Sequence, residues 1–366
     1  MNLTFKYRLF PSNSQRTSLK KSLAACCFVY NQALETRKDA WETHKKKVGR
    51  YDTINMIPGW KHEHSFLRDA FSQCLQEACV RVDLAFRSFF RRVKAGDKPG
   101  YPRFKSLGRY DSFTYTQSGF RLLDNGRLRL SKIGDVKIKL HRQIRGEVRT
   151  LTVRRDSVGN WYACFSCSVQ PRPLPFTDKV VGIDLGLTTF AYFSNGKKIK
   201  RKRWMKRDSK DIARLQRKRE QFPKGSKKRE RVTKALRHAY QRQSNRRKDF
   251  AHKESRKLVN EYQFISLEDL DISGMQSNGN RTINRGIADV AWARFVQYTV
   301  YKAEDAGRSV VLVNPKNTTQ ECSGCGKIVP KGLSVRKHEC FYCGLSLDRD
   351  HNAALNILAR GLASLG

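Results

Sequence analysis

The hydrophobic pattern at the start of the chain predicts one strand followed by two long helices. Residues 2–10 alternate apolar and polar side chains, the pattern of a strand with one buried face. Apolar residues then recur every three or four positions through 14–45 and again through 62–95, which is typical of amphipathic helices. The stretch 49–60 interrupts this spacing, and we expect it to separate the two helices.

Short alternating segments follow, which predicts a change from helices to β-structure. The Asn-Gly pair at 125–126 is typical of a tight hairpin turn, because both residue types tolerate a positive φ angle. A Pro-rich segment, 171–176, ends this region and predicts a domain boundary. We therefore assign residues 1–10 and 96–175 to a β-barrel-like domain that carries the helical block 11–95 as an insertion.

After this boundary, strand patterns alternate with helical ones, as in an α/β sheet domain. Strands are expected at 180–186, 189–194, 264–270 and 309–315, and helices at 205–260, at 288–306 and at the end of the chain. Residues 176–366 are therefore assigned to one α/β domain, and the whole chain to a multidomain α+β fold.

The chain is strongly basic: 366 residues include 74 Lys and Arg against 33 Asp and Glu, a net charge of +41. Such a surplus indicates a polyanionic partner, and interleaved aromatic residues favour nucleic acid over a membrane surface. The densest run, 197–231, holds eighteen Lys or Arg and is expected to face nucleic acid, with a solvated charged face as the alternative. The chain shows neither a transmembrane pattern nor an apolar signal core, so we expect a cytoplasmic protein without a membrane partner.

Ten cysteines in an intracellular protein favour metal binding over disulfides. Two C-x2-C pairs, Cys322 with Cys325 and Cys340 with Cys343, are each followed directly by Gly, which permits the tight turn that directs both sulfurs at one ion. Four thiolates suit a tetrahedral structural zinc ion, and they leave no coordination position open for catalysis. His338 lies near them in the sequence and is surplus to a complete set.

The remaining cysteines are interpreted as packing residues. Cys164 and Cys167 also form a C-x2-C pair, but they lie in a strand pattern without a turn, where residues three apart point to opposite faces. The other four take apolar positions of the two predicted helices: Cys26, Cys27, Cys74 and Cys79.

Three carboxylates stand out against the basic composition. Asp184 lies in the apolar run VVGIDLG, where an unpaired charge is costly. Glu268 follows the apolar run FISL, and Asp350 opens a terminal helix whose Ala353 and Ala354 permit close packing on a sheet. Acids that converge at a sheet edge are the ligands that a pair of magnesium ions uses in phosphodiester cleavage, and such ions would supply positive charge beside Asp184.

Each acid also has a simpler interpretation, which the residues alone leave open. Asp350 could cap the last helix, and Glu268 could be an ordinary strand end with Asp269 and Asp271 as rival candidates. The segment GIDLG also resembles the phosphate-binding segment of actin-like and sugar-kinase-like ATPases. Those folds need a Gly-Gly adenosine loop, and the chain has no Gly-Gly pair.

Several stretches together closely resemble the TnpB family of transposon-encoded RNA-guided DNA endonucleases, relatives of the type V CRISPR effectors. The resemblance runs nearly from end to end and is carried by FKYRLFPSNSQ, CCFVYNQALETRKDAW, KPGYPRFKS, VVGIDLGLTTFA, HKESRKLVNEYQFISLEDLDISGM, WARFVQYTVYKAEDAGRSVVLVNPKNTTQECSGCG and DRDHNAALNIL. Its most specific feature is the order of acid, acid, four cysteines and acid along the chain.

The resemblance implies a wedge β-barrel with an inserted helical recognition block, followed by a RuvC-like nuclease domain of RNase H fold. Within that nuclease domain it implies a helical lid at 205–260 and a zinc-ribbon insertion at 318–345. In the DRD segment the family pattern points to Asp350 rather than Asp348. Matched residue by residue, the family's two magnesium ions would be held by Asp184, Glu268 and Asp350, and its one structural zinc ion by Cys322, Cys325, Cys340 and Cys343.

The function that the resemblance implies is RNA-guided, metal-dependent cleavage of double-stranded DNA for a transposable element, at the nucleoid of a prokaryotic host. A noncoding guide RNA and a short target-adjacent motif would select the DNA. Two alternatives stay open: a guided DNA-binding repressor, which the intact acids disfavour, and an unguided resolvase or transposase. Some aromatic residues could stack on bases, although core packing is the simpler interpretation: Tyr101, Phe104, Tyr110 and Trp161.

Overall fold

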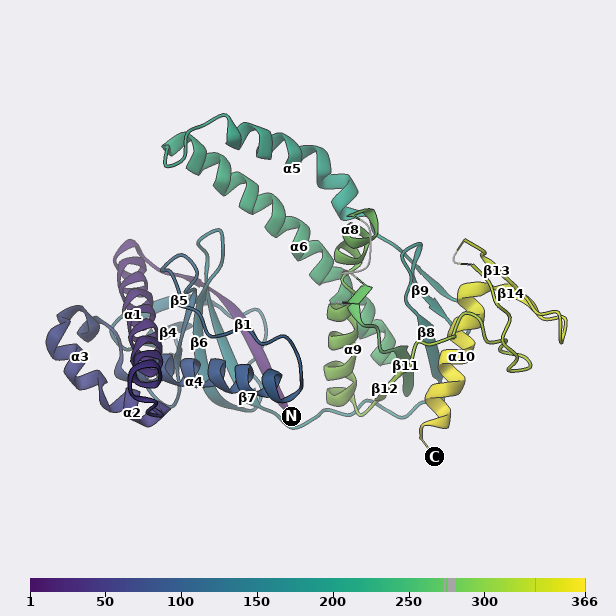
Figure 1. Cartoon of the computed structure of the whole chain (residues 1–366), viewed down its shortest axis with the longest axis horizontal. Coiled ribbons are helices and arrows are strands. Elements are labelled where there is room, and N and C mark those ends of the chain that lie inside the picture. Colours follow the sequence, from purple (N-terminus) through teal and green to yellow (C-terminus); the bar gives the residue numbers. More distant parts are fainter. Residues whose placement is uncertain (273, 276–280, 333, 366) are drawn as a thin grey trace. The chain divides into compact units, whose positions relative to one another are not determined.

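The computed structural model describes residues 1–272, 274–275, 281–332 and 334–365, without the side chains of 281–283 and 285. The chain divides into two compact units, Met1–Val169 and Gln170–Gly366, which are both drawn in Figure 1. The Pro-rich segment that predicted a boundary follows this division directly.

The first unit is built on a curled antiparallel sheet. Its strands are β1 (Asn2–Phe10), β2 (Ser112–Tyr115), β3 (Phe120–Leu122), β4 (Arg127–Leu130), β5 (Gly134–Lys139), β6 (Glu147–Arg155) and β7 (Trp161–Ser168). They are ordered β2-β6-β7-β1-β5-β4-β3, so the N-terminal strand pairs with β7 and β5 in the middle of the sheet. The rings of Tyr115 and Phe120, in the two edge strands, lie 6.3 Å apart, so the sheet forms a nearly closed barrel.

Helices fill the chain between β1 and β2. They are α1 (Asn13–His44), α2 (Arg50–Asn55), α3 (Ile57–Glu63), a 3-10 helix (Ser65–Asp69) and α4 (Ser72–Lys94). Helix α1 confirms the first predicted helix and begins with a capping box between Ser12 and Gln15. The stretch 49–60 separates α1 from α4 as expected, but it is itself helical. Asp52 accepts a hydrogen bond from the Gly49 N–H (2.7 Å) at the start of α2, and Pro58 lies in the first turn of α3. The second long helix begins only at Ser72, ten residues later than predicted.

The hairpin at the Asn-Gly pair is confirmed, but its turn differs from the predicted one. Strands β3 and β4 pair with Leu122 opposite Leu128. Of the two turn residues only Gly126 has a positive φ angle, +69°. The Gly126 N–H donates to the carbonyl of Leu123 (3.0 Å), so the loop is a four-residue turn that ends in a left-handed Gly.

One continuous hydrophobic cluster joins the helices of the first unit to its sheet. The predicted helix-core positions Leu23, Cys27 and Tyr30 are at most 6% exposed, as the helical spacing required. Phe90, on the same pattern in α4, is the exception at 61% exposed. Cys26, Cys74 and Cys79 are buried, which confirms their interpretation as packing residues.

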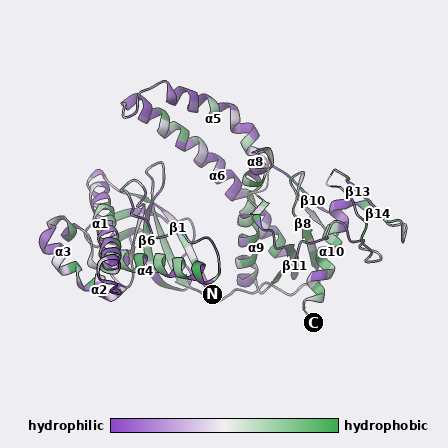
Figure 2. Cartoon of the chain, in the orientation of Figure 1, coloured by the Kyte–Doolittle hydropathy of each residue, from purple (hydrophilic) through white to green (hydrophobic). Residues whose placement is uncertain are grey.

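The second unit contains a mixed five-stranded sheet. Its strands are β8 (Val180–Asp184), β9 (Thr189–Phe193), β10 (Lys198–Lys200), β11 (Phe264–Glu268) and β12 (Ser309–Val313), in the order β10-β9-β8-β11-β12. Strands β8, β11 and β12 are parallel, and β9 runs against β8. Leu267 pairs with Ile183, so β8 and β11 end side by side at one edge of the sheet. Figure 2 shows these central strands as mainly hydrophobic.

The helical segments of the second unit are more interrupted than the sequence predicted. They are α5 (Trp204–Glu220), α6 (Lys227–Glu261), α8 (Arg281–Val290), α9 (Trp292–Ala306) and α10 (Arg349–Ala363), with a small hairpin of β13 (Lys337–Glu339) and β14 (Ser346–Asp348). The helical stretch expected at 205–260 is a pair of helices, separated by a turn with Gly225 at φ +85°. The helix expected at 288–306 is divided by Ala291 in the left-handed region (φ 57°), and it ends at Gly307 as predicted.

Helices α5 and α6 form an antiparallel hairpin with little apolar contact. Ile212, Leu236 and Ala239 form its small buried cluster, and most other side chains are polar, as Figure 2 shows along both helices. An ion pair between Arg246 and Asp208 (2.9 Å) links the two. No helix in the described part of the chain is long and apolar enough to span a bilayer.

Helix α10 lies against β8 and β11 with almost no space between the backbones. A Cβ atom at Gly182 in β8 would lie 2.2 Å from the carbonyl oxygen of Ala354, and one at Gly361 in α10 would lie 2.3 Å from Oγ of Ser266. Ser266 itself donates a hydrogen bond to the carbonyl of Ile357 (2.8 Å). Ala353 and Ala354 are fully buried, as predicted from their size. This contact brings the first turn of α10 to the strand ends.

Replacing Gly182 with Ala should lower the free energy of unfolding of the second unit by about 1–3 kcal/mol, because β8 or α10 must move to admit the methyl group. Thermal and denaturant unfolding measure the change. The matched substitution Gly332→Ala, where the nearest atom would be 3.9 Å away, should leave stability unchanged. Equal stability of the two variants would contradict the close packing.

Candidate metal centres

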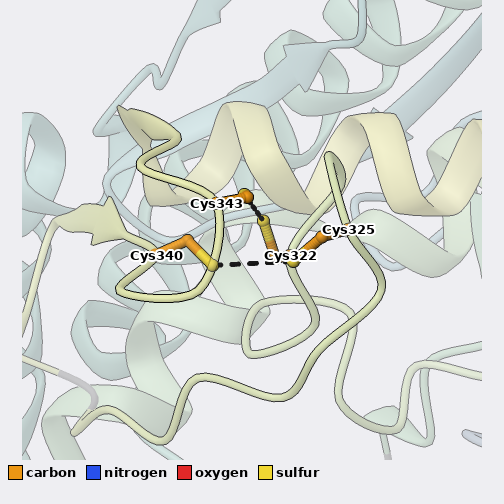
Figure 3. Close-up of side chains that lie close together, drawn as sticks. All are labelled: Cys322, Cys325, Cys340 and Cys343. Atoms are coloured by element: carbon orange, nitrogen blue, oxygen red, sulfur yellow. Dashed lines mark hydrogen bonds between the residues drawn. The ribbon is translucent and has the colours of Figure 1, made fainter.

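The four cysteines predicted as zinc ligands come together in the second unit (Figure 3). Each C-x2-C pair forms the same turn: the Gly326 N–H donates to the carbonyl of Cys322, and the Gly344 N–H to that of Cys340, both at 2.8 Å. Gly326 and Gly344 both have φ +74°, which confirms why Gly follows each pair. The sulfurs of Cys322, Cys325, Cys340 and Cys343 all lie within 4.8 Å of one another.

The spacing of these sulfurs fits a tetrahedral zinc ion. Four sulfurs at 2.3 Å from a central ion are about 3.8 Å apart. The distance between Sγ of Cys322 and Cys343 is 3.6 Å, and that between Sγ of Cys325 and Cys340 is 3.7 Å. The cluster therefore supplies four soft ligands in a closed arrangement, which suits zinc in a structural role.

Other candidate ligands lie outside this cluster. His338 is fully buried in β13, where its Nδ1 contacts Nζ of Lys331, and it is not part of the set of four. Cys164 and Cys167 lie on opposite faces of β7, one partly exposed and one buried. Both predictions, that His338 is surplus and that this second C-x2-C pair is not a site, agree with the geometry.

Asp184 and Glu268 end two neighbouring parallel strands. Asp184 is the last residue of β8 and Glu268 the last of β11, and they are 8% and 7% exposed. Oε1 of Glu268 accepts a hydrogen bond from the hydroxyl of Thr318 (2.6 Å). Among rival acids, Asp269 is exposed and Asp271 accepts a local hydrogen bond from the Gly274 N–H (2.9 Å). Of Glu268, Asp269 and Asp271, only Glu268 is therefore buried at the end of β11.

Asp350 lies in the first turn of α10 but does not cap it. The cap is Asp348, whose Oδ1 accepts a hydrogen bond from the Asp350 N–H (2.9 Å). The carboxylate of Asp350 is left for other partners: Arg349 Nη2 lies 3.1 Å from its Oδ1, and Arg336 Nη1 lies 4.0 Å away. The capping interpretation that the sequence left open thus belongs to Asp348.

The electrostatics of Asp184 connect the three acids. Burial raises its pKa well above the ordinary value for Asp, and the negative charges of Glu268 and Asp350 raise it further, with a small opposite effect of Arg349. Burial also raises the pKa of Glu268, against the hydrogen bond from Thr318 and the charge of Arg360, which lower it. Among the acids described in the first unit, none has a pKa that neighbouring acids raise in this way. In a chain with a net charge of +41, the ends of β8 and β11 are a local negative centre.

This centre fits hard divalent cations. Among the described residues, none forms a hydrogen bond or ion pair with the carboxylate of Asp184, although the residue is only 8% exposed. Carboxylate oxygens are the protein ligands that magnesium prefers, and a cation would offset both the burial and the mutual repulsion. Within the described residues only the four cysteines meet the 4.8 Å spacing, so the three carboxylates stand further apart than ligands of one ion.

Sequence reasoning did not identify two residues of this centre, Thr318 and Arg349. Thr318 is one of several hydroxyl residues before the first cysteine, and nothing in its local pattern marks it. Arg349 directly precedes Asp350, and only its adjacency to a candidate acid could have suggested a role.

The four aromatic candidates for base stacking separate into two kinds. Tyr110 and Trp161 are 7% and 3% exposed and belong to the core of the first unit. Tyr101 and Phe104 are 46% and 52% exposed, and the Tyr101 ring lies 5.4 Å from that of Phe89. Two of the four are therefore available at the surface.

Comparisons with known proteins converge on one family. Residues 164–279 match the family described as "Probable transposase", and 292–357 match "Cas12f1-like, TNB domain". A Streptomyces pristinaespiralis protein named "Putative RNA-guided DNA endonuclease" is 35% identical and is aligned over 98% of this chain and 89% of its own. An Escherichia coli K12 protein, "Putative RNA-guided DNA endonuclease InsQ", is 29% identical over 99% and 92%. Among solved structures, the mini-RNA-guided endonuclease CRISPR-Cas_phi3 is aligned over 99% of this chain and 92% of its own chain, with 10% sequence identity. The TM-score of this alignment is 0.49, which is too low to equate the two folds.

The cysteine cluster, the acids at the strand ends and the basic composition fit the class of proteins that bind metal ions and nucleic acid. The chain belongs to the TnpB family of transposon-encoded RNA-guided DNA endonucleases. This confirms the resemblance seen in the sequence.

One family description does not suit the structure. Residues 1–46 match the model described as "Helix-turn-helix domain". In the structure this segment is strand β1 followed by α1, a single helix of 32 residues without an internal turn. The match to this family therefore gives no ground for a helix-turn-helix mode of DNA recognition by this segment.

Purified protein should carry one zinc ion per chain, and Cys340→Ser should lose it. Without the ion, amides at 318–345 should lose protection from hydrogen exchange while β8 and β11 stay protected, because zinc binding supplies the folding energy of such small sites. Metal analysis and exchange mass spectrometry measure both effects. Cys164→Ser, in the C-x2-C pair that is not a site, should retain full zinc content; equal zinc loss in both variants would contradict the assignment.

Proposed function

We propose that this protein is an RNA-guided DNA endonuclease of a transposable element, which cleaves DNA by metal-dependent phosphodiester hydrolysis. The observation that carries the proposal is the group of Asp184, Glu268 and Asp350, whose negative charges act on Asp184 near the ends of β8 and β11 in a strongly basic chain. Family membership supports it, because two relatives aligned over nearly the whole chain bear the name of an RNA-guided DNA endonuclease.

The three acids would hold the catalytic magnesium ions. When bound, such ions activate a water molecule and stabilise the charge that develops on the phosphate. The chain's own contribution is to hold the carboxylates in a fixed, partly dry position, with Asp184 and Glu268 on the sheet and Asp350 on α10. Arg349 pairs with Asp350 and limits the negative charge at the rim of the centre.

The basic surface would hold the nucleic acids. Helices α5 and α6 expose most of their Lys and Arg side chains, and only a few apolar residues of this hairpin are buried. Phosphates of a guide RNA and of DNA suit such a surface, and contacts of this kind give affinity with little sequence preference. Base pairing between guide RNA and DNA would then supply specificity, with a short adjacent motif read by the protein.

We extend the proposal to the domains. Residues 1–10 and 96–175 would form the wedge barrel, 11–95 the recognition block, and 176–366 a RuvC-like domain of RNase H fold. The hairpin within 205–260 would cover the cleft as a lid, and 318–345 would be the zinc-ribbon insertion. The curled sheet of the first unit and the mixed sheet of the second support this division.

The substitution Asp184→Asn should reduce DNA cleavage about 1,000-fold or more while guide RNA binding is kept. Loss of one ligand removes several kcal/mol of transition-state stabilisation, and each 1.4 kcal/mol is a factor of ten. Single-turnover cleavage of a plasmid that carries the matching target measures the rate. Asp178→Asn, at an exposed acid shortly before β8, is the matched control and should cleave like the wild type.

The same variant provides its own test of folding. Removal of a buried charge that Glu268 and Asp350 repel should raise the thermal stability of the magnesium-free protein. A variant that is more stable and inactive supports the metal-binding role, whereas full cleavage by Asp184→Asn in magnesium would contradict it.

Protein purified from its native locus should retain a discrete noncoding RNA. Its affinity should fall steeply with salt, with a log–log slope of roughly −0.7 to −0.9 per contacted phosphate. Sequencing of the bound RNA and titration at several salt concentrations test both points. Cleavage without any bound RNA would favour an unguided transposase, and RNA-directed binding without nicking would favour a repressor.

A further inference from the structure

The hydroxyl of Thr318 is the described side-chain partner of the candidate catalytic acid Glu268. Its Oγ1 donates to Oε1 at 2.6 Å, the length of a charge-assisted bond, while the carbonyl of Pro315 lies further away at 3.1 Å. Thr318 is 2% exposed and Glu268 is 7% exposed, so water does not replace this bond easily. The orientation of the carboxylate thus depends on where the chain places Thr318.

Helix α10 fixes the backbone of Thr318. The Asn356 side chain donates from one Nδ2 group to the carbonyl of Thr318 (2.9 Å) and to that of Glu321 (2.7 Å). Asn352, one turn earlier, donates to the same carbonyl of Glu321 (2.7 Å) and accepts from the Ser323 N–H (2.9 Å). One turn later, Arg360 pairs with the Glu321 carboxylate (2.5 Å).

These three side chains form one stripe, because residues four apart lie on the same face of a helix. The stripe of Asn352, Asn356 and Arg360 grips a segment that runs from Thr318 at the acidic centre to Cys322 at the cysteine cluster. The opposite small face of α10 packs on β8 and β11. The same helix carries Asp350 in its first turn. The segment that carries the cysteine cluster is therefore joined to Glu268 through the Thr318 hydroxyl and to Asp350 through α10 itself.

We propose that Thr318 is a positioning residue for Glu268, and that the stripe on α10 couples the folded cysteine cluster to the acidic centre. The inference rests on the proposed function for the role of Glu268. Loss of the Thr318 hydroxyl leaves a buried carboxylate oxygen without its donor, so Glu268 turns away from the position in which it binds an ion. Loss of the cluster releases the segment that carries Thr318 and has the same result.

The test measures ion affinity directly, with Mn²⁺ as the probe, on zinc-loaded full-length protein by isothermal titration calorimetry. Thr318→Val keeps the shape and removes the hydroxyl, and it should weaken Mn²⁺ binding about 10- to 100-fold, as substitutions behind metal ligands do. Thr318→Ser restores the hydroxyl and should recover most of the affinity. Thr299→Val is the matched control: Thr299 is fully buried in α9 and donates to the carbonyl of Phe295 (2.9 Å), far from any acid of the centre in sequence and bonding.

Three outcomes separate the possible failures. Mn²⁺ affinity of Thr318→Val equal to that of the wild type overturns the positioning role. An equal loss in Thr299→Val overturns it too, because the effect would then be general destabilisation. If wild-type protein binds no Mn²⁺, or Asp184→Asn binds it as well as the wild type, the proposed function fails instead.

The coupling has its own variant. Asn356→Ala removes both hydrogen bonds to the segment and should weaken Mn²⁺ binding while zinc content stays at one ion per chain. The cleavage rate of this variant and of Thr318→Val should recover at high magnesium concentration, because ion binding is impaired and the remaining chemistry is intact. Unchanged Mn²⁺ affinity of Asn356→Ala overturns the coupling through α10.

Discussion

The second unit depends on one contact, in which α10 lies against β8 too closely for any side chain at Gly182. Two glycines, Gly182 and Gly361, and the hydrogen bond from Ser266 to Ile357 make this approach possible. Because the helix lies so near, its first turn reaches the edge where β8 and β11 end. An acid from α10 is thus placed near two acids from the sheet, and this candidate centre depends on the apolar packing below it.

This packing brings the acids close to one another although their negative charges repel. Burial and the charges of Glu268 and Asp350 all raise the pKa of Asp184, so the metal-free centre opposes folding. Arg349 and Arg360 offset part of this repulsion without a direct bond to Asp184. The apolar core of the unit, with fully buried residues such as Ile265 and Phe295, supplies the stability that holds the acids together. A bound cation would stabilise such a centre, which is typical where function and stability compete.

Most of the regular elements, and all the candidate ligands, could be predicted from periodicity, spacing and composition. Strands β1, β8 and β11 follow from local alternation or apolar runs, and the cysteine turns follow from the Gly after each pair. The breaks were harder, because the helices at 49–60 depend on local caps and the break at Ala291 on a backbone angle that no composition signals. The identity of the helix cap needed coordinates as well: Asp348 and Asp350 are two residues apart, and both are acidic. Thr318 could not be found, since its importance comes from a contact fifty residues away in sequence.

The two candidate metal centres differ in chemistry but share their support. Four sulfur ligands in a tetrahedral arrangement favour zinc, whereas buried carboxylates favour a hard cation, so the two centres would select different ions. Among the described residues, the hydrophobic cluster of the cysteine segment consists of Cys322, Val329 and Cys340 with Leu345 packed against them, too small a core to fold without an ion. Once folded, it is tied by Asn352 to the same helix that carries Asp350. A zinc ion in this cluster would be structural in its coordination, and the segment that it would stabilise carries the hydrogen bond from Thr318 to Glu268.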